Sequence, residues 1–186
     1  PWTFFAGSLA RGVGSLVANQ ALVRKIYFPR EIMPLAAVMA GFVDFLIAGV
    51  VFLGMLVYYG VGMTPHALLF IPILLVQITF VLGIVLLLAP LNVFYRDIGH
   101  VMPLLVQIWM FASPIIYPMS MVPERFRGIY ALNPMVGIID GYRKVLIQGI
   151  PPDYNALGSA AAVAAVFFAV GIIFFKRLEF KLADVI

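Results

Sequence analysis

Two charged residues lie within long apolar runs, and packing alone does not explain them. Asp44 is flanked on both sides by pairs of apolar residues. If that run crosses a bilayer, an acid at its centre is costly unless it is paired or hydrated, so it marks a functional position by default. Arg11 is the only cation inside a neighbouring predicted span. Proton relay and a structural Arg11–Asp44 ion pair are both open from the sequence.

Residue combinations typical of catalytic or metal sites are missing from the sequence. His66 and His100 stand alone, there is no HExxH motif, and no pair of acids shares a predicted helix face. The chain has no cysteine, which excludes thiol nucleophiles and Cys-ligated metals. No GxxxxGK[ST] loop is present to bind a nucleotide phosphate. We therefore expect no metal and no cofactor in this chain, and any ATP that it uses must be hydrolysed by a separate subunit.

The composition indicates that this chain is a membrane protein. Of the 186 residues, 64% are hydrophobic and 11% are charged, with a mean hydropathy of +1.10, whereas a soluble domain has roughly a quarter charged residues. This excludes a soluble enzyme, a nucleic-acid-binding module and a disordered chain. The apolar runs approach the ~20 residues that span a bilayer as a helix, without the alternation of a membrane barrel. The predicted fold is an all-α integral membrane protein, a polytopic helical bundle with five transmembrane helices at Pro1–Val23, Met33–Tyr59, Ala67–Leu91, Val101–Met119 and Leu157–Phe175.

Basic residues set the predicted orientation. They gather in three short polar segments that five spans place on one side, whereas Gly60–His66 on the other side has no Lys or Arg. The positive-inside rule makes the basic segments cytoplasmic and places the first residue outside. An odd number of spans with this orientation suggests that a first helix is missing. The basic residues are Arg24, Lys25 and Arg30, then Arg96, then Lys176, Arg177 and Lys181.

A segment between the last two spans predicts an outer hairpin. Pro123-Glu124 and Asn133-Pro134 indicate a helix start and a break, giving helices at Glu124–Leu132 and Met135–Gln148, closed by Gly149. Both are too short to cross, so we expect a re-entrant or interfacial hairpin over residues 123–148. An amphipathic outer loop without function is the alternative. Tyr130 and Tyr142 are expected at headgroup depth. The basic side chains are expected to reach water or lipid phosphate, and they are Arg125, Arg127, Arg143 and Lys144.

Prolines interrupt the span that precedes this hairpin. Pro103, Pro114 and Pro118 each remove a backbone hydrogen bond, so Val101–Met119 is expected to be kinked or to end early. In lipid, the freed carbonyls need protein or water as a partner. The stretch Ser113–Pro118 is therefore expected to face other helices or a pathway, unless the kink is purely structural.

Two cytoplasmic segments combine charge with aromatic residues. The first, residues 24–31, has the sequence RKIYFPRE and joins two spans. A solvated loop would rarely carry Ile26, Tyr27 and Phe28 together, which favours an element that docks into a partner's groove. Adsorption on anionic headgroups is the alternative. The second is Tyr95-Arg96-Asp97, whose adjacent charges fit a functional loop and a simple helix terminus equally well.

Four motifs in order resemble the membrane subunit of type-2 ATP-binding-cassette exporters, in the branch that exports polysaccharides such as O-antigen, capsule or teichoic acid. The resemblance covers essentially the whole chain. The motifs are PWTFF with SLAR at residues 1–11, YFPRE at 27–31, NVFYRDI at 92–98, and SPIIYP at 113–118 with NPM at 133–135.

The resemblance implies an architecture and partners that composition does not. Such permeases have six spans after an amphipathic cytoplasmic helix, so this chain resembles one without that helix and the first span. They form homodimers around a channel in the bacterial cytoplasmic (inner) membrane. Each copy docks on a nucleotide-binding ATPase subunit that uses ATP and Mg. They export polysaccharide linked to a polyprenyl diphosphate lipid.

The resemblance also assigns expected roles to residues. The resemblance implies contact with the ATPase for the coupling segment, here residues 24–31, and for the Tyr95–Asp97 loop on the same face. The outer hairpin matches the family's gate helices. Arg11, in the first span, is a further candidate to bind lipid phosphate. Aromatic residues of the channel would stack on sugar rings. The coupling candidates are Arg24, Lys25, Ile26, Tyr27, Phe28, Pro29, Arg30, Glu31, Tyr95, Arg96 and Asp97. The channel candidates are Trp2, Phe4, Phe5, Trp109, Phe111 and Tyr117, unless these are lipid anchors or packing residues.

Two alternative functions remain at this stage. A type-2 permease for a drug or a small lipid would use the same coupling segment. A membrane-embedded transferase acting on polyprenyl-linked sugars would use Asp44 or Asp140 as a base and would turn over without an ATPase.

Overall fold

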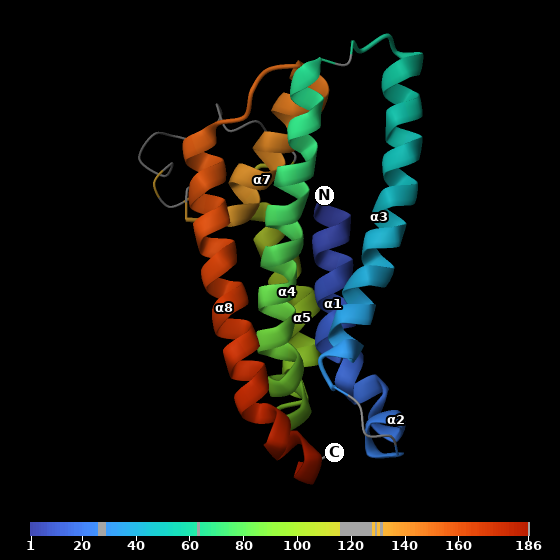
Figure 1. Ribbon diagram of the computed structural model, residues 1–186, viewed down its shortest axis with the longest axis vertical. Helices are drawn as coiled ribbons and strands as arrows, with labels where there is room; N and C mark the ends of the chain where they lie inside the picture. The colour runs from blue at the N-terminus through green and yellow to red at the C-terminus, as the bar shows by residue number, and fades with distance from the viewer. Residues whose placement is uncertain (26–28, 63, 116–127, 129, 131, 186) are drawn as a thin grey trace.

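The protein is a bundle of roughly parallel and antiparallel helices (Figure 1). The computed structural model describes residues 1–25, 29–62, 64–115, 128, 130 and 132–185, and it describes side chains there except at 23–25 and 180–185. Within these residues there is no β-strand, which confirms the predicted all-α fold. The elements are α1 (Trp2–Ala18), α2 (Gln20–Lys25), α3 (Ile32–Tyr58), the 3₁₀ turn η1 (Pro65–Leu69), α4 (Phe70–Phe94), α5 (Asp97–Phe111), α7 (Pro134–Arg143), the π-helical turn η3 (Lys144–Gln148) and α8 (Tyr154–Val185).

Three helical segments of the described chain are long and apolar enough to cross a membrane. They are Ile32–Tyr58, Pro65–Phe94 and Tyr154–Glu179. The other two predicted spans correspond to shorter helices, α1 with 17 residues and α5 with 15. At 1.5 Å per residue, these two reach only about 25 Å and 22 Å.

The first predicted span is two helices rather than one. Helix α1 ends at Ala18 because Asn19 caps it: both the backbone amide and the side-chain Nδ2 of Asn19 donate to the carbonyl of Ser15, at 3.2 Å and 2.8 Å. The short helix α2 then begins at Gln20. The chain therefore turns at two adjacent polar residues, Asn19 and Gln20.

The fourth predicted span also ends earlier than its apolar run. Helix α5 begins at Asp97 and ends at Phe111, whereas the apolar run extends to Met119. The last four residues of this run lie outside the described part of the chain. Pro114 has no amide hydrogen to continue the ladder and disfavours a helical residue before it. Proline therefore ends this helix early, which is one of the two outcomes expected from its sequence.

The bundle is tightest where α8 lies along α4. A Cβ atom on Gly171 would come within 2.4 Å of the Gly83 carbonyl oxygen, and one on Gly83 would come within 2.6 Å of the backbone of Phe167. Only glycine allows backbones to approach this closely. Helix α1 packs against α3 and α4, and most of α3 stays exposed on the outer side of the bundle (Figure 1).

Aromatic residues fill the core beside this contact. Phe5, fully buried, stacks on Phe80 with ring centroids 5.8 Å apart. Trp109 meets both rings edge-on at 5.2 Å and 5.9 Å. This cluster joins α1, α4 and α5 at one level of the bundle.

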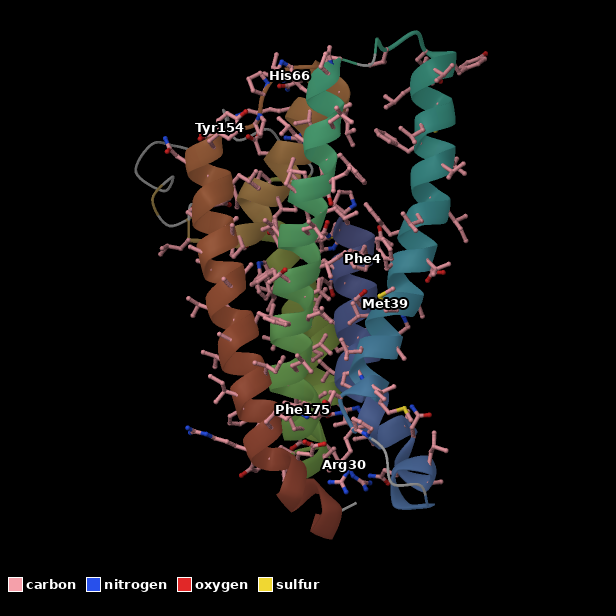
Figure 2. All side chains as sticks on the ribbon, viewed as in Figure 1. Phe4, Arg30, Met39, His66, Tyr154 and Phe175 are labelled. Atoms are coloured by element: carbon pink, nitrogen blue, oxygen red, sulfur yellow. The ribbon has the colours of Figure 1, made fainter. Side chains whose placement is uncertain are left out.

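The two ends of the bundle carry different segments. Arg30 and Phe175 lie at one end, and His66 and Tyr154 lie at the other (Figure 2). Helix α4 runs from the His66 end toward the Arg30 end, so the loop after it lies with Arg30. The basic segments at the start of α3, after α4 and late in α8 therefore share one end of the molecule.

Candidate functional site

The predicted coupling segment lies between α2 and α3. Arg24 and Lys25 are the last residues of α2, and their side chains are not described. Ile26, Tyr27 and Phe28 lie outside the described residues. Pro29 is exposed, and Arg30 and Glu31 are partly buried just before α3 begins. Within the described part of this segment, Pro29 is therefore open to solvent, and Arg30 and Glu31 contact the rest of the protein.

Charged contacts hold that attached end against α8. The Nζ of Lys176 donates to Glu31 Oε1 at 2.6 Å and lies 3.2 Å from Glu179 Oε2. Arg30 donates from Nη1 to the backbone carbonyl of Glu179. Burial alone raises the pKa of Glu31, but the hydrogen bond and charge of Lys176 offset it, so the pKa lies below its usual 4.5.

The second predicted coupling element is an exposed turn on the same end. Tyr95, Arg96 and Asp97 are all exposed between α4 and α5. Asn92 holds this turn in place, because its Nδ2 donates to the Val13 carbonyl at 3.1 Å and its Oδ1 accepts from the Gly99 amide at 2.7 Å. The turn is therefore anchored to α1 while its three polar or aromatic side chains remain open to a partner.

Arg11 and Asp44 meet, as the ion-pair hypothesis requires. The Arg11 Nη2 lies 3.3 Å from Asp44 Oδ2, and the two side chains are 48% and 68% exposed in this chain. Helix α3 can approach because a Cβ on Gly41 would lie 2.5 Å from Ser8 Oγ and 2.7 Å from Arg11 Nη2. A half-exposed ion pair within an apolar bundle is unfavourable against hydrocarbon. This face of α1 and α3 therefore suits contact with protein or water better than contact with lipid chains.

A cavity of about 540 Å³ opens beside this pair. Its walls come from α1, α3, the start of α4, α7, η3 and Ile115, and most of them are apolar. The charged side chains on the lining are Arg11, Asp44 and Arg143, and aromatic rings make up part of the apolar lining. The aromatic residues are Trp2, Phe4, Phe45, Phe52, Phe70 and Tyr142.

Asn133 joins the start of α7 to the end of α5. Its Oδ1 accepts from Trp109 Nε1 at 3.0 Å and from the Met135 amide at 3.1 Å. Its Nδ2 donates to the Ala112 carbonyl at 3.2 Å and to Ser113 Oγ at 3.0 Å. One side chain thus caps the start of α7 and satisfies a carbonyl at the end of α5. The second helix of the predicted hairpin is present as α7 and η3, and it ends at Gly149 with a positive φ of 66°.

The predicted lipid-phosphate residues mostly bind protein groups. Arg143 donates through Nη2 to the carbonyls of Pro114 and Ile115, both at 3.3 Å, so it satisfies two backbone carbonyls just after α5 ends. Lys144 pairs with Asp140 at 2.8 Å. Tyr130 is partly buried, and Arg125 and Arg127 lie outside the described residues.

Tyr142, predicted to lie at headgroup depth, is buried among protein groups. Its side chain is 4% exposed, and its hydroxyl donates to Gln77 Oε1 at 2.9 Å. Gln77 in turn donates from Nε2 to the carbonyl of Pro1 at 2.8 Å. The sequence pattern placed Tyr142 at an interface because of its amphipathic side chain, but a buried glutamine provides the partner that water would otherwise supply.

The predicted channel aromatics that the structure describes fall into three groups. Phe5 and Trp109 form the core cluster described above, so packing occupies their rings in this arrangement. Trp2 and Phe4 border the cavity, although Phe4 is only 3% exposed. Phe111 is 61% exposed at the end of α5, and Tyr117 lies outside the described residues.

Sequence reasoning missed the role of three amides. Gln77, Asn92 and Asn133 each link two or more segments, and the first two are almost fully buried. A signal was available: an amide in an apolar span needs a hydrogen-bonding partner, which neighbouring helices provide. The acids proposed as bases in the transferase hypothesis, Asp44 and Asp140, are both paired with cations.

Comparisons with known proteins agree with this arrangement. A sequence profile described as ABC-2 type transporter matches residues 2–147. The chain is 33% identical over 182 residues to the O-antigen export system permease protein RfbA of Myxococcus xanthus, covering 96% of this chain and 70% of that protein. It is 29% identical over 187 residues to the protein of the same name from Klebsiella pneumoniae, covering 100% and 72%. It is 23% identical to the polysialic acid transport protein KpsM of Escherichia coli, covering 96% and 70%. The chain belongs to the ABC-2 type transporter family.

Proposed function

We propose that this chain is the membrane permease subunit of a polysaccharide exporter. It moves a lipid-linked polysaccharide, such as O-antigen or capsule on a polyprenyl diphosphate, out across the bacterial cytoplasmic (inner) membrane. The observation that carries the proposal is its similarity, along nearly its whole length, to relatives named for O-antigen export and polysialic acid transport. A separate ATPase drives the movement, and two copies of the permease form the pathway.

The sequence and the bundle support the division of labour between permease and ATPase. The chain has no phosphate-binding loop for a nucleotide. Its basic segments share one end of the bundle, which the positive-inside rule assigns to the cytoplasm. At that end, Pro29 and the turn at Tyr95–Asp97 are exposed and can receive a partner. We assign the ATPase contact to residues 24–31 and to this turn.

The cavity beside Arg11 and Asp44 supports a substrate-facing role for that side of the permease. Guanidinium groups bind phosphate through paired hydrogen bonds, and Arg11 is held there by a carboxylate that a phosphate can replace. Trp2 and Phe4 border the same cavity and offer ring faces to sugars or prenyl groups. In this proposal, lipid phosphate meets Arg11, while Arg143 holds the hairpin in shape.

The coupling assignment has a direct test. Arg24→Glu and Lys25→Glu combined with Pro29→Ala should weaken co-purification with the ATPase and lower the amount of polysaccharide at the cell surface. The matched control is Arg177→Glu, because Arg177 is an exposed cation at the same end but outside the coupling segment. Unchanged ATPase binding and unchanged export in the triple variant would contradict the coupling assignment.

A further inference from the structure

Helix α8 touches both the coupling segment and the outer hairpin, and neither contact was anticipated from the sequence. At one end, four residues form a charged clasp: Arg30 and Glu31 before α3, with Lys176 and Glu179 on α8. The closest of its ion pairs joins Lys176 Nζ to Glu31 Oε1 at 2.6 Å. The second oxygen, Glu31 Oε2, is buried and has no hydrogen-bond partner among the described residues. Lys176 is thus the main described compensation for this carboxylate.

The charged clasp lies next to a cluster of packed apolar side chains. Phe175, the residue before Lys176, is 1% exposed and packs with Leu16, Leu86, Ala89 and Val93. Met33, two residues after Glu31, packs against the same cluster. Figure 2 shows Arg30 and Phe175 at the same end of the bundle. Charge contacts and close packing therefore connect the end of the coupling segment with α8, and packed interiors resist independent movement.

The middle of α8 lies against α4 at backbone distance. Gly83 and Gly171 bring the two backbones into direct contact, as described above. Helix α8 is continuous from Tyr154 to Val185, so its backbone hydrogen bonds connect the Lys176 end with the first turn. Over 32 residues the helix is about 48 Å long.

The other end of α8 lies against the hairpin helix α7. A Cβ on Gly137 would come within 2.5 Å of the Ala156 carbonyl oxygen and within 3.4 Å of the Ala160 methyl carbon. Ala160 is 1% exposed at this contact. The first turn of α8 thus touches α7 at backbone distance, and Tyr154 in this turn lies at the end of the bundle opposite Arg30 (Figure 2).

We propose that α8 is the element that carries movement of the coupling segment to the outer hairpin, and that Lys176 is the positioning residue that engages it. This inference rests on the proposed function, because it takes the coupling segment as the part that the ATPase moves. The physical requirement for such a route is a contiguous set of rigid contacts between the two sites. The charged clasp, the glycine contact with α4 and the Gly137 contact with α7 provide that set.

The test measures the accessibility of a residue in the hairpin while nucleotide binding to the ATPase moves the coupling segment. The chain has no natural cysteine, so Leu132→Cys, at a position 73% exposed beside Asn133, provides a single label site. In the full permease–ATPase complex, we expect its labelling rate by a membrane-impermeant maleimide to differ between ATP-analogue and ADP states. Lys176→Glu should bring the ratio of the two rates to about one, because the clasp then repels Glu31. Adding Glu31→Lys to Lys176→Glu restores opposite charges and should restore the nucleotide dependence.

The controls separate this inference from the proposed function. Arg177→Glu makes the same charge change one residue away, outside the charged clasp, and should keep the nucleotide-dependent ratio. Co-purification with the ATPase is measured for every variant: a loss of binding in the unsubstituted chain would contradict the proposed function itself. An unchanged ratio in Lys176→Glu, a reporter that never responds to nucleotide, or failure of the double substitution to restore the response would overturn the inference.

Discussion

At the scale of single residues, the amides and charges of the bundle each connect more than one segment. Asn133 joins α5 to α7, Asn92 joins α4 to α1 and α5, and Arg143 binds two backbone carbonyls just after α5. In a membrane an interhelical hydrogen bond contributes only about 0.6 kcal/mol on average. A residue matters here because it makes several such bonds at once.

Replacing Asn133 should therefore loosen the hairpin. Asn133→Ala removes four hydrogen bonds and leaves Trp109 Nε1 without its acceptor, so we expect a loss of about 2 kcal/mol in the free energy of unfolding. Thermal unfolding of the purified protein in detergent measures it. Asn155→Ala, an exposed amide at the start of α8, is the control and should change the midpoint little. Equal midpoints for the two variants would count against the role of Asn133.

The Glu31–Lys176 pair predicts a dependence on pH. Because the pKa of Glu31 is lowered by the bond with Lys176, the folded state favours the charged carboxylate. Its contribution to stability is complete above the ordinary pKa of 4.5 and is lost as the pH falls through the lowered folded-state value. The difference in unfolding midpoint between the parent chain and Glu31→Gln should be present at pH 7 and should shrink below pH ~4. A difference that stays constant down to pH ~3 would show that the charge of Glu31 contributes nothing.

At the scale of elements, glycine positions decide how closely the helices pack. Gly171→Ala places a Cβ 2.4 Å from the Gly83 carbonyl, and a backbone atom cannot give way as a flexible side chain would. We expect a loss of about 2 kcal/mol or more in the free energy of unfolding, read from the detergent unfolding midpoint. At Gly54, where no atom lies within 4 Å of an added Cβ, the same substitution should be neutral or slightly stabilising. If both variants unfold alike, the α4–α8 contact is not as close as described.

The elements also show how far sequence reasoning reaches. Apolar runs near Met33, Ala67 and Leu157 predicted long helices whose bounds lie within about three residues of those observed, except that α8 continues ten residues past the predicted end at Phe175, because apolar length is a local property. The breaks at Asn19 and Phe111 depend on local capping and proline chemistry, and the sequence indicated only the second. The burial of Tyr142 and the contact of Lys176 with Glu31 depend on segments 65 and 145 residues apart. Nearly uniform apolar helices give no periodicity from which such pairings could be read.

At the scale of the whole molecule, the arrangement predicts a sidedness that can be measured in cells. The cysteine-free chain allows one cysteine at a time in place of His66 or Arg96, which lie in the loops at opposite ends of α4. We expect the cysteine at position 66 to react with an impermeant maleimide in intact cells. The cysteine at position 96 should react only after the membrane is opened, because basic segments stay in the cytoplasm. The reverse pattern would invert the proposed orientation, and with it the side on which the ATPase docks.

The central claim is that this permease exports polysaccharide only when a partner ATPase drives it. The most direct measurement is surface polysaccharide in cells that make the glycan but lack their own permease, with this protein supplied alone, with its ATPase, or with an ATPase unable to hydrolyse ATP. We predict surface polysaccharide only with the active ATPase, and lipid-linked polysaccharide retained inside in the other two cases. Export by the permease alone, or retention of the glycan when both active subunits are present, would contradict the account.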